Sequence, residues 1–221
     1  LKQKDRLVSS SGSDILARSR SVLTGRSLDE LAANAGVQRL DAAVLGPTGP
    51  GETLPKKLGP MLAESTETAS SDPNWLYEPK LDGYRVIAFI QDGTVRLQSR
   101  RGIDLTAAFP ELVADLAAQA VDSMILDGEI VALDATTGRP SFNHLQNRRE
   151  LKAPAEIAVA QREAPVVMLC FDLLHFAGIN LRGSTYVDRR RYLSQCLLTT
   201  SHLQLVHATD NAEKLYAASL A

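Results

Sequence analysis

Residues 77–99 read YEPKLDGYRVIAFIQDGTVRLQS and contain the clearest structural signal in the sequence. The second part of this stretch holds two runs rich in β-branched and aromatic residues, joined by Asp92–Gly93. An Asp-Gly pair between two such runs is the strongest short signal of a β-hairpin, because both residues of the tight turn need a positive φ. The stretch therefore predicts two antiparallel strands, entered from a segment that carries Lys80.

Further apolar runs extend the predicted sheet beyond this hairpin. SMILDGEIVALD at 123–134 and APVVMLCFDLLHFAG at 164–178 are expected to be buried strands. AAFPELVADLAAQA at 107–120 and TYVDRRRYLSQCLL at 185–198 repeat apolar residues at helical spacing. The predicted fold class is α+β, with antiparallel and mixed sheets and flanking helices.

The composition of the 221 residues fits a globular protein with a sizeable core, since 44% are hydrophobic and 23% are charged. No apolar run is long enough to span a bilayer and no signal-peptide pattern is present, so we expect a cytoplasmic protein without membrane contact. Cys170 and Cys196 are expected to be buried thiols rather than a disulfide or zinc ligands.

The charge balance gives little support for nucleic-acid binding, because the net charge is −2 and a nucleic-acid surface is usually basic. Three arginine clusters are locally basic despite the negative net charge. The plain interpretation of each cluster is a solvated helix or loop face. The clusters are Arg100–Arg101, Arg148–Arg149 and Arg189–Arg190–Arg191.

The N-terminal part differs in composition from the rest of the chain. A serine-rich run and the Gly/Pro-rich GPTGPGETLP at 46–55 are typical of linkers. Between them, SLDELAANAG at 27–36 carries the N-cap, capping-box and stop signals of one short helix. We therefore expect a linker and helical segment at 1–52, followed by a separate domain at 53–221.

The first candidate site is EPKLDGYR, residues 78–85. A turn at Asp82–Gly83 between solvated charges would explain the glycine, but not why Lys80 and Arg85 crowd one place. A lysine amine is normally protonated, with a pKa near ~10.4, and partial burial beside cations can make it a nucleophile toward phosphorus. Arg85 suits the adjoining role, because a guanidinium binds phosphate oxygens in pairs.

Three later residues complete the candidate site. In DGEIVAL, residues 127–133, Asp127 is expected to make a turn, while Glu129 can accept a ribose hydroxyl or support a hydrated Mg²⁺. In CFDLLHFAG, residues 170–178, Phe171 is either a core aromatic or a ring that stacks on a purine. Arg100 follows the hairpin and is either an ordinary exposed arginine or part of the site.

The order and spacing of these segments resemble the covalent nucleotidyltransferase superfamily. KLDGYR is similar to its motif I, SRRG to the arginine segment that follows, DGE to motif III and FDLL to motif IIIa. LGPMLA at 58–63 further resembles the opening of the adenylation domain in bacterial ATP-dependent DNA ligases. SVLTGRSLDELAA at 21–33 is similar to the linker between the upstream domain and the ligase domain of the multidomain end-joining DNA ligase D family.

The resemblance implies a covalent nucleotidyltransferase, ATP-grasp-like fold at 53–221, in which the nucleotide lies in a groove between sheets. It implies that Lys80 is adenylated and that Glu78 contacts the adenine edge. It also implies that Arg85 and Arg100 hold the ribose and the phosphates.

The remaining implied roles concern Glu129 and Phe171. Glu129 would bind the ribose or a metal ion, and Phe171 would stack on the base. The cofactors that the resemblance implies are ATP and Mg²⁺ or Mn²⁺. The implied partners are nicked or broken duplex DNA and, from the N-terminal similarity, the end-joining protein Ku.

The implied activity is DNA ligation through an AMP adduct on Lys80. After Leu181 we find neither the metal-binding glutamate segment of motif IV nor the paired lysines of motif V, so we expect the chain to end inside the adenylation domain. Two alternatives stay open. One is an RNA ligase or a GTP-using capping enzyme with the same lysine, and the other is a non-catalytic DNA-binding or docking module.

Overall fold

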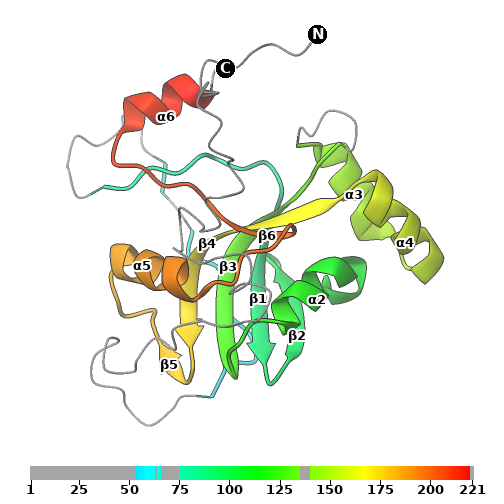
Figure 1. Ribbon diagram of the computed structural model, residues 1–221, viewed down its shortest axis with the longest axis horizontal. Helices are drawn as coiled ribbons and strands as arrows, with labels where there is room; N and C mark the ends of the chain where they lie inside the picture. The colour runs from blue at the N-terminus through cyan, green and yellow to red at the C-terminus, as the bar shows by residue number, and fades with distance from the viewer. Residues whose placement is uncertain (1–52, 63, 66–74, 135–139, 220–221) are drawn as a thin grey trace, which may run out of the picture. The chain divides into compact units, whose positions relative to one another are not determined.

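The computed structural model describes residues 53–62, 64–65, 75–134 and 140–219, and Figure 1 shows their helices and strands. The predicted segment at 1–52, with its short helix, lies outside the described residues. Among the described helices, none has the length and apolar character that crossing a membrane requires. The elements are β1 (Tyr84–Gln91), β2 (Thr94–Ser99), η3 (Thr106–Ala108), α2 (Pro110–Ala117), β3 (Ser123–Ala132), α3 (Phe142–Glu150), α4 (Pro154–Glu163), β4 (Val166–Phe176), β5 (Ile179–Asn180), α5 (Tyr186–Cys196), β6 (Leu203–Leu205) and α6 (Ala212–Ser219).

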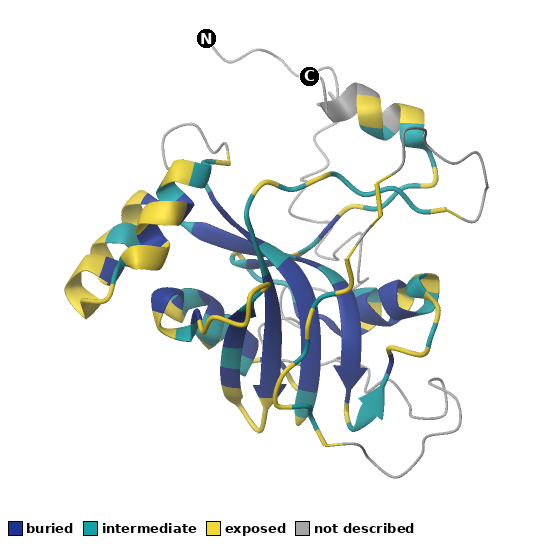
Figure 2. Ribbon diagram, turned by 180° about the vertical axis from the view of Figure 1, so that it is seen from behind, coloured by how far each residue is buried: buried dark blue, intermediate teal, exposed yellow. Residues whose placement is uncertain are grey.

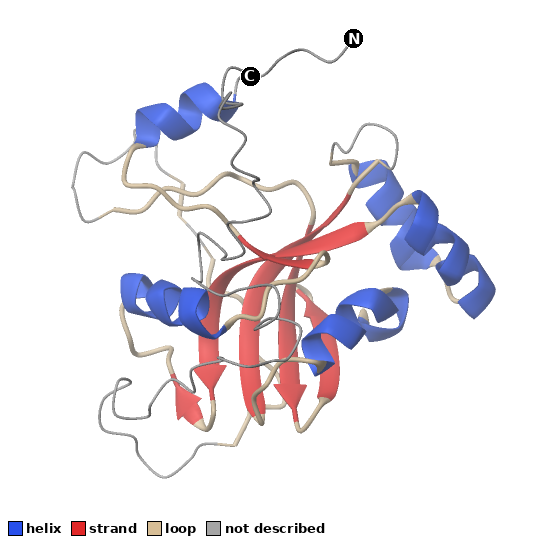
Figure 3. Ribbon diagram, in the orientation of Figure 1, coloured by secondary structure: helices blue, strands red, loops and turns tan. Residues whose placement is uncertain are grey.

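The strands form one six-stranded sheet, drawn in red in Figure 3. Its order is β2-β1-β3-β4-β5 with antiparallel neighbours, and β6 pairs in parallel with β4. The predicted hairpin is confirmed, because Asp92 and Gly93 have φ of 48° and 74° and connect the paired residues Gln91 and Thr94. The α+β class and the mixed sheet are therefore as predicted.

The larger part of the core lies on one face of the sheet. Val86, Ala88 and Ile90 alternate along β1 and pack into one cluster with residues of α2 and α5. Cys170 and Cys196 are free thiols buried in the same cluster, so their predicted burial is confirmed. Burial raises the pKa of Cys196 to about 12, so this thiol stays protonated at neutral pH.

The opposite face of the sheet, seen in Figure 2, carries a smaller apolar cluster. It contains Ile87 and Phe89 of β1, and Leu58 of segment 53–62 packs against it. Gln98 Nε2 donates to the Leu58 carbonyl at 2.7 Å and fastens this segment to β2. Arg85 stands two residues before Ile87 in β1, so its side chain belongs to this second face.

The structure corrects two sequence predictions about charged residues. Asp127 and Gly128 do not form a turn, because they lie inside β3 at a shift in its register with β4. Arg148, Arg189 and Arg190 are not on solvated faces, because only 1%, 4% and 8% of their surfaces are exposed. Each of the three lies beside a carboxylate, as a buried guanidinium requires.

Candidate active site

Lys80 lies exposed in the segment that leads into β1. The chain bends at Gly83, as predicted, and there it passes against β3. A Cβ atom on Gly83 would lie 2.2 Å from the carbonyl oxygen of Ile130, so the approach requires glycine. The backbone N–H of Gly83 donates to the Glu129 carboxylate, which also feels the charge of Lys80. The approach of Gly83 thus brings Lys80 and Glu129 into one site.

Arg85 is held from two sides. Its Nε and Nη2 donate to the two carboxylate oxygens of Asp127 at 3.0 and 2.8 Å. Its guanidinium carbon lies 5.2 Å from the centre of the Phe171 ring, within cation–π range. Burial raises the pKa of Asp127, and the Arg85 guanidinium opposes that rise. Since Asp127 occupies Nε and Nη2, Nη1 is the nitrogen best placed to reach a ligand.

Glu129 lies directly opposite Arg85 in the register between β1 and β3. The residue is half-buried, and burial raises its pKa to about 7, against the lowering effect of Arg85 and of the Gly83 N–H. Within the described residues, no three His, Cys, Asp or Glu side chains gather as a metal site. Mg²⁺ often uses only one or two carboxylates together with substrate phosphates, so a single carboxylate at Glu129 fits that ion.

A cavity of about 470 Å³ opens where β1 begins and β2 ends. Arg85, Arg100 and Glu129 line it together, so three of the six predicted residues meet there. Its remaining walls come from residues near these three and from α3. Lys80 and Phe171 do not line the cavity, but each interacts with a residue that does. The charge of Lys80 acts on the Glu129 carboxylate, and the Phe171 ring contacts the Arg85 guanidinium.

Phe171 is neither fully buried nor fully exposed. It is half-buried and lies outside both apolar clusters, unlike its neighbours Cys170 and Leu173. The ring is therefore not a member of either described core cluster. Stacking of the ring on a base stays a prediction.

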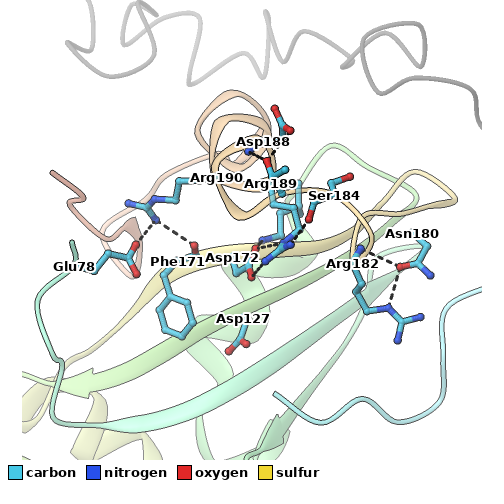
Figure 4. Close-up of polar contacts among 12 residues, drawn as sticks. Glu78, Asp127, Phe171, Asp172, Asn180, Arg182, Ser184, Asp188, Arg189 and Arg190 are labelled. Carbon is cyan, nitrogen blue, oxygen red and sulfur yellow. Dashed lines mark hydrogen bonds and ion pairs between the residues drawn. The ribbon is translucent and has the colours of Figure 1, made fainter. Parts of the chain in front are cut away.

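Glu78 lies beside α5 rather than in the cavity. Its carboxylate is 3.3 Å from Nη1 of Arg190 and lies next to the Tyr186 hydroxyl. Burial raises the pKa of Glu78. Arg190 also donates to the carbonyl oxygen of Phe171 at 3.4 Å, as Figure 4 shows. Helix α5 thus ties the segment before Lys80 to the strand that carries Phe171.

Buried ion pairs beneath the site were missed by sequence reasoning. Arg189 donates to both carboxylate oxygens of Asp172 at 2.8 Å, and Asp172 lies opposite Asp127 in the sheet (Figure 4). Each aspartate stands at a buried position of a strand made mostly of apolar residues. That placement was the available signal, because a carboxylate buried in a strand needs a cation to offset its desolvation.

These features match a known family. Residues 60–220 match the ATP dependent DNA ligase domain, and the chain belongs to that family. The expectation of a DNA ligase adenylation domain is therefore confirmed at the level of the family and of the fold.

Several relatives are end-joining proteins. The chain is 39% identical over 145 residues to the multifunctional non-homologous end joining DNA repair protein LigD of Mycobacterium tuberculosis, an alignment that covers 65% of this chain and 17% of that protein. It is 36% identical over 180 residues to the multifunctional non-homologous end joining protein LigD of Pseudomonas aeruginosa, which covers 81% of this chain and 20% of that protein. The chain thus spans about a fifth of the length of these relatives.

Solved structures agree with this family. The ligase domain of LigD from M. tuberculosis matches with a TM-score of 0.53 and 36% identity, over 66% of this chain and 44% of that one. A mycobacterial DNA ligase D complexed with ATP and MES matches with the same values.

Proposed function

We propose that this domain performs the first step of DNA ligation, the transfer of AMP from ATP to Lys80. The observation that carries the proposal is that Lys80 is exposed and that its charge acts on the Glu129 carboxylate, which lines a cavity together with four arginines. Membership of the ligase family and the solved ATP complex of a relative support it.

The proposed step is a nucleophilic displacement at phosphorus. Lys80 Nζ loses a proton to solvent water, to which the side chain is exposed. The nitrogen then forms a bond to the α-phosphorus of ATP, and the bond from that phosphorus to the bridging oxygen breaks. The electron pair of that bond leaves with pyrophosphate. Arg85 Nη1 and Arg100 offset the charge that develops on the phosphate oxygens. Phe171 offers its ring to the adenine, and Arg190 holds Glu78 at the adenine edge.

A divalent cation fits this site through Glu129. Its carboxylate lines the cavity and is half-buried, so a cation there would relieve the cost of ionising it. Mg²⁺ or Mn²⁺ bound by Glu129 would supply charge neutralisation to the triphosphate.

The later steps are proposed by analogy with the relatives. AMP would pass from Lys80 to a 5′-phosphate at a nick or break in duplex DNA, and a 3′-hydroxyl would then displace it. End joining, a partnership with Ku and a cytoplasmic place of action are part of the same proposal.

The test is covalent labelling of the full chain. Incubation with α-labelled ATP and Mg²⁺, followed by denaturation, is expected to leave one acid-labile AMP per chain on Lys80. Labelling by GTP in preference to ATP would point instead to a capping-type enzyme. DNA binding without any covalent nucleotide would favour the non-catalytic docking module.

Phe171→Leu is expected to weaken ATP binding about tenfold while changing the free energy of unfolding little. Loss of an aromatic ring from a base stack costs roughly 1–3 kcal/mol, and the half-buried side chain belongs to neither apolar cluster. Isothermal titration measures the affinity, and thermal unfolding measures the stability.

Phe89→Leu is the matched control for this prediction. Phe89 also carries a stacked arginine, with the Arg96 carbon 3.9 Å from its ring centre, but it lies at the far end of β1. The Phe89→Leu variant should be less stable than the parent chain and should bind ATP with the same affinity. If Phe171→Leu behaves in the same way, the ring has no role in base binding.

A further inference from the structure

Helix α3 supplies a wall of the cavity that no sequence motif indicated. Phe142, Gln146 and Arg149 stand at helical positions i, i+4 and i+7, and all three line the cavity. Tyr84 fixes the helix there: its ring meets Phe142 edge to face with centres 5.5 Å apart, and Arg149 lies 5.5 Å from the same ring. The wall thus has a defined position relative to the start of β1.

The charges that line the cavity are strongly unbalanced. Four arginines face a single carboxylate, that of Glu129, and one of the four, Arg85, is already neutralised by Asp127. Among the described residues, no acidic side chain forms an ion pair with Arg100, Arg101 or Arg149. These three side chains are exposed toward solvent, so their positive field is open to a ligand.

We infer that Arg149, together with Arg100 and Arg101, forms a phosphate-binding site on the α3 side of the cavity. Its ligand is a phosphate group, which a guanidinium binds through two parallel N–H donors. Gln146 adds an amide donor one turn earlier on the same helix face. The phosphate belongs either to the triphosphate of ATP or to the backbone of bound DNA.

This inference rests on the proposed function for the identity of the phosphate source, but its own evidence is the cavity wall. A purely structural role for Arg149 makes a different prediction. Arg149 stands in the last turn of α3, where a cation favours the helix C-terminus. In that case its removal would lower stability and leave phosphate affinity unchanged.

The test compares Arg149→Ala with Arg162→Ala, both made in the full chain that also carries Lys80→Ala. Arg162 is an exposed arginine in the last turn of α4 and does not line the cavity, so it matches Arg149 in type and helix position. The Lys80→Ala background prevents covalent capture, so only reversible binding is measured. Dissociation constants are taken for ATP, for adenosine and for a nicked duplex at several salt concentrations.

If the phosphate comes from ATP, Arg149→Ala weakens ATP binding about tenfold or more and leaves adenosine binding unchanged. If it comes from DNA, the same change lowers the slope of log affinity against log salt by about one unit. Arg149→Lys, which keeps the charge but loses the paired donors, should restore part of the loss.

The inference fails if Arg149→Ala and Arg162→Ala give equal affinities for every ligand, or if ATP and adenosine weaken equally without a change in salt slope. The proposed function has a separate criterion, which is covalent labelling of the chain that retains Lys80. If phosphate binding depends on Arg149 but the chain that retains Lys80 forms no covalent AMP adduct, the proposed adenylation is rejected. The phosphate-binding site would still stand.

Discussion

Lys80→Ala is expected to abolish covalent AMP labelling, with no residual adduct after denaturation. The variant lacks the only nitrogen that the proposed displacement uses, so the loss is complete rather than graded. The Lys80 side chain is exposed, and its truncation should leave the melting temperature unchanged. Scintillation counting of the denatured protein and peptide mapping of the adduct provide the measurement.

Lys152→Ala provides the control for this result. Lys152 is also exposed and lies between α3 and α4, apart from the residues that line the cavity. Its removal should leave labelling unchanged. An adduct that persists in Lys80→Ala would show that another residue is the nucleophile, and the assignment of this site would fall.

Gly83→Ala is expected to abolish labelling as well and to lower the free energy of unfolding by about 1–3 kcal/mol. The added Cβ would meet the Ile130 carbonyl oxygen at 2.2 Å, and that atom belongs to the backbone of β3 and cannot rotate away. The start of β1 must therefore move away from β3. The pairing of Arg85 with Glu129 lies at that point, so the site is disturbed together with the fold.

Gly183→Ala is the matched control, because no atom lies within 4 Å of a Cβ built at Gly183. Thermal unfolding and ATP labelling should both match the parent chain. If Gly83→Ala unfolds and labels like Gly183→Ala, the close approach of Gly83 to β3 has no role in positioning Lys80.

Two ion pairs offset the carboxylates that lie at and beneath the site. Arg85–Asp127 and Arg189–Asp172 place two carboxylates of adjacent strands opposite each other, and each carboxylate has its own guanidinium. Removing one partner of such a pair leaves an uncompensated buried charge. We therefore regard Arg189 as a positioning residue for Arg85 rather than as a ligand of the nucleotide.

Local chemistry allowed part of this fold to be predicted from the sequence. Asp92–Gly93 favours a hairpin turn through its own φ preferences, and Pro110 begins a helix because its ring suits the first turn. β3 and β4 were predicted because apolar runs of that length must be buried. The motif order from Lys80 to Phe171 was sufficient to indicate the family, which the comparisons confirm.

The class of the fold, its main strands and the segment that carries Lys80 could thus be predicted from the sequence. The ion-pair partners of the charged residues, by contrast, depend on how the chain folds. Arg85 finds Asp127 at a distance of 42 residues along the chain, and Arg189 finds Asp172 at 17. The sequence can indicate that a carboxylate is buried, but not which cation offsets the cost of its burial, because only folding brings the two partners together. The position of Arg149 of α3 in the cavity wall likewise depends on how the helix packs against the sheet, which the sequence does not show.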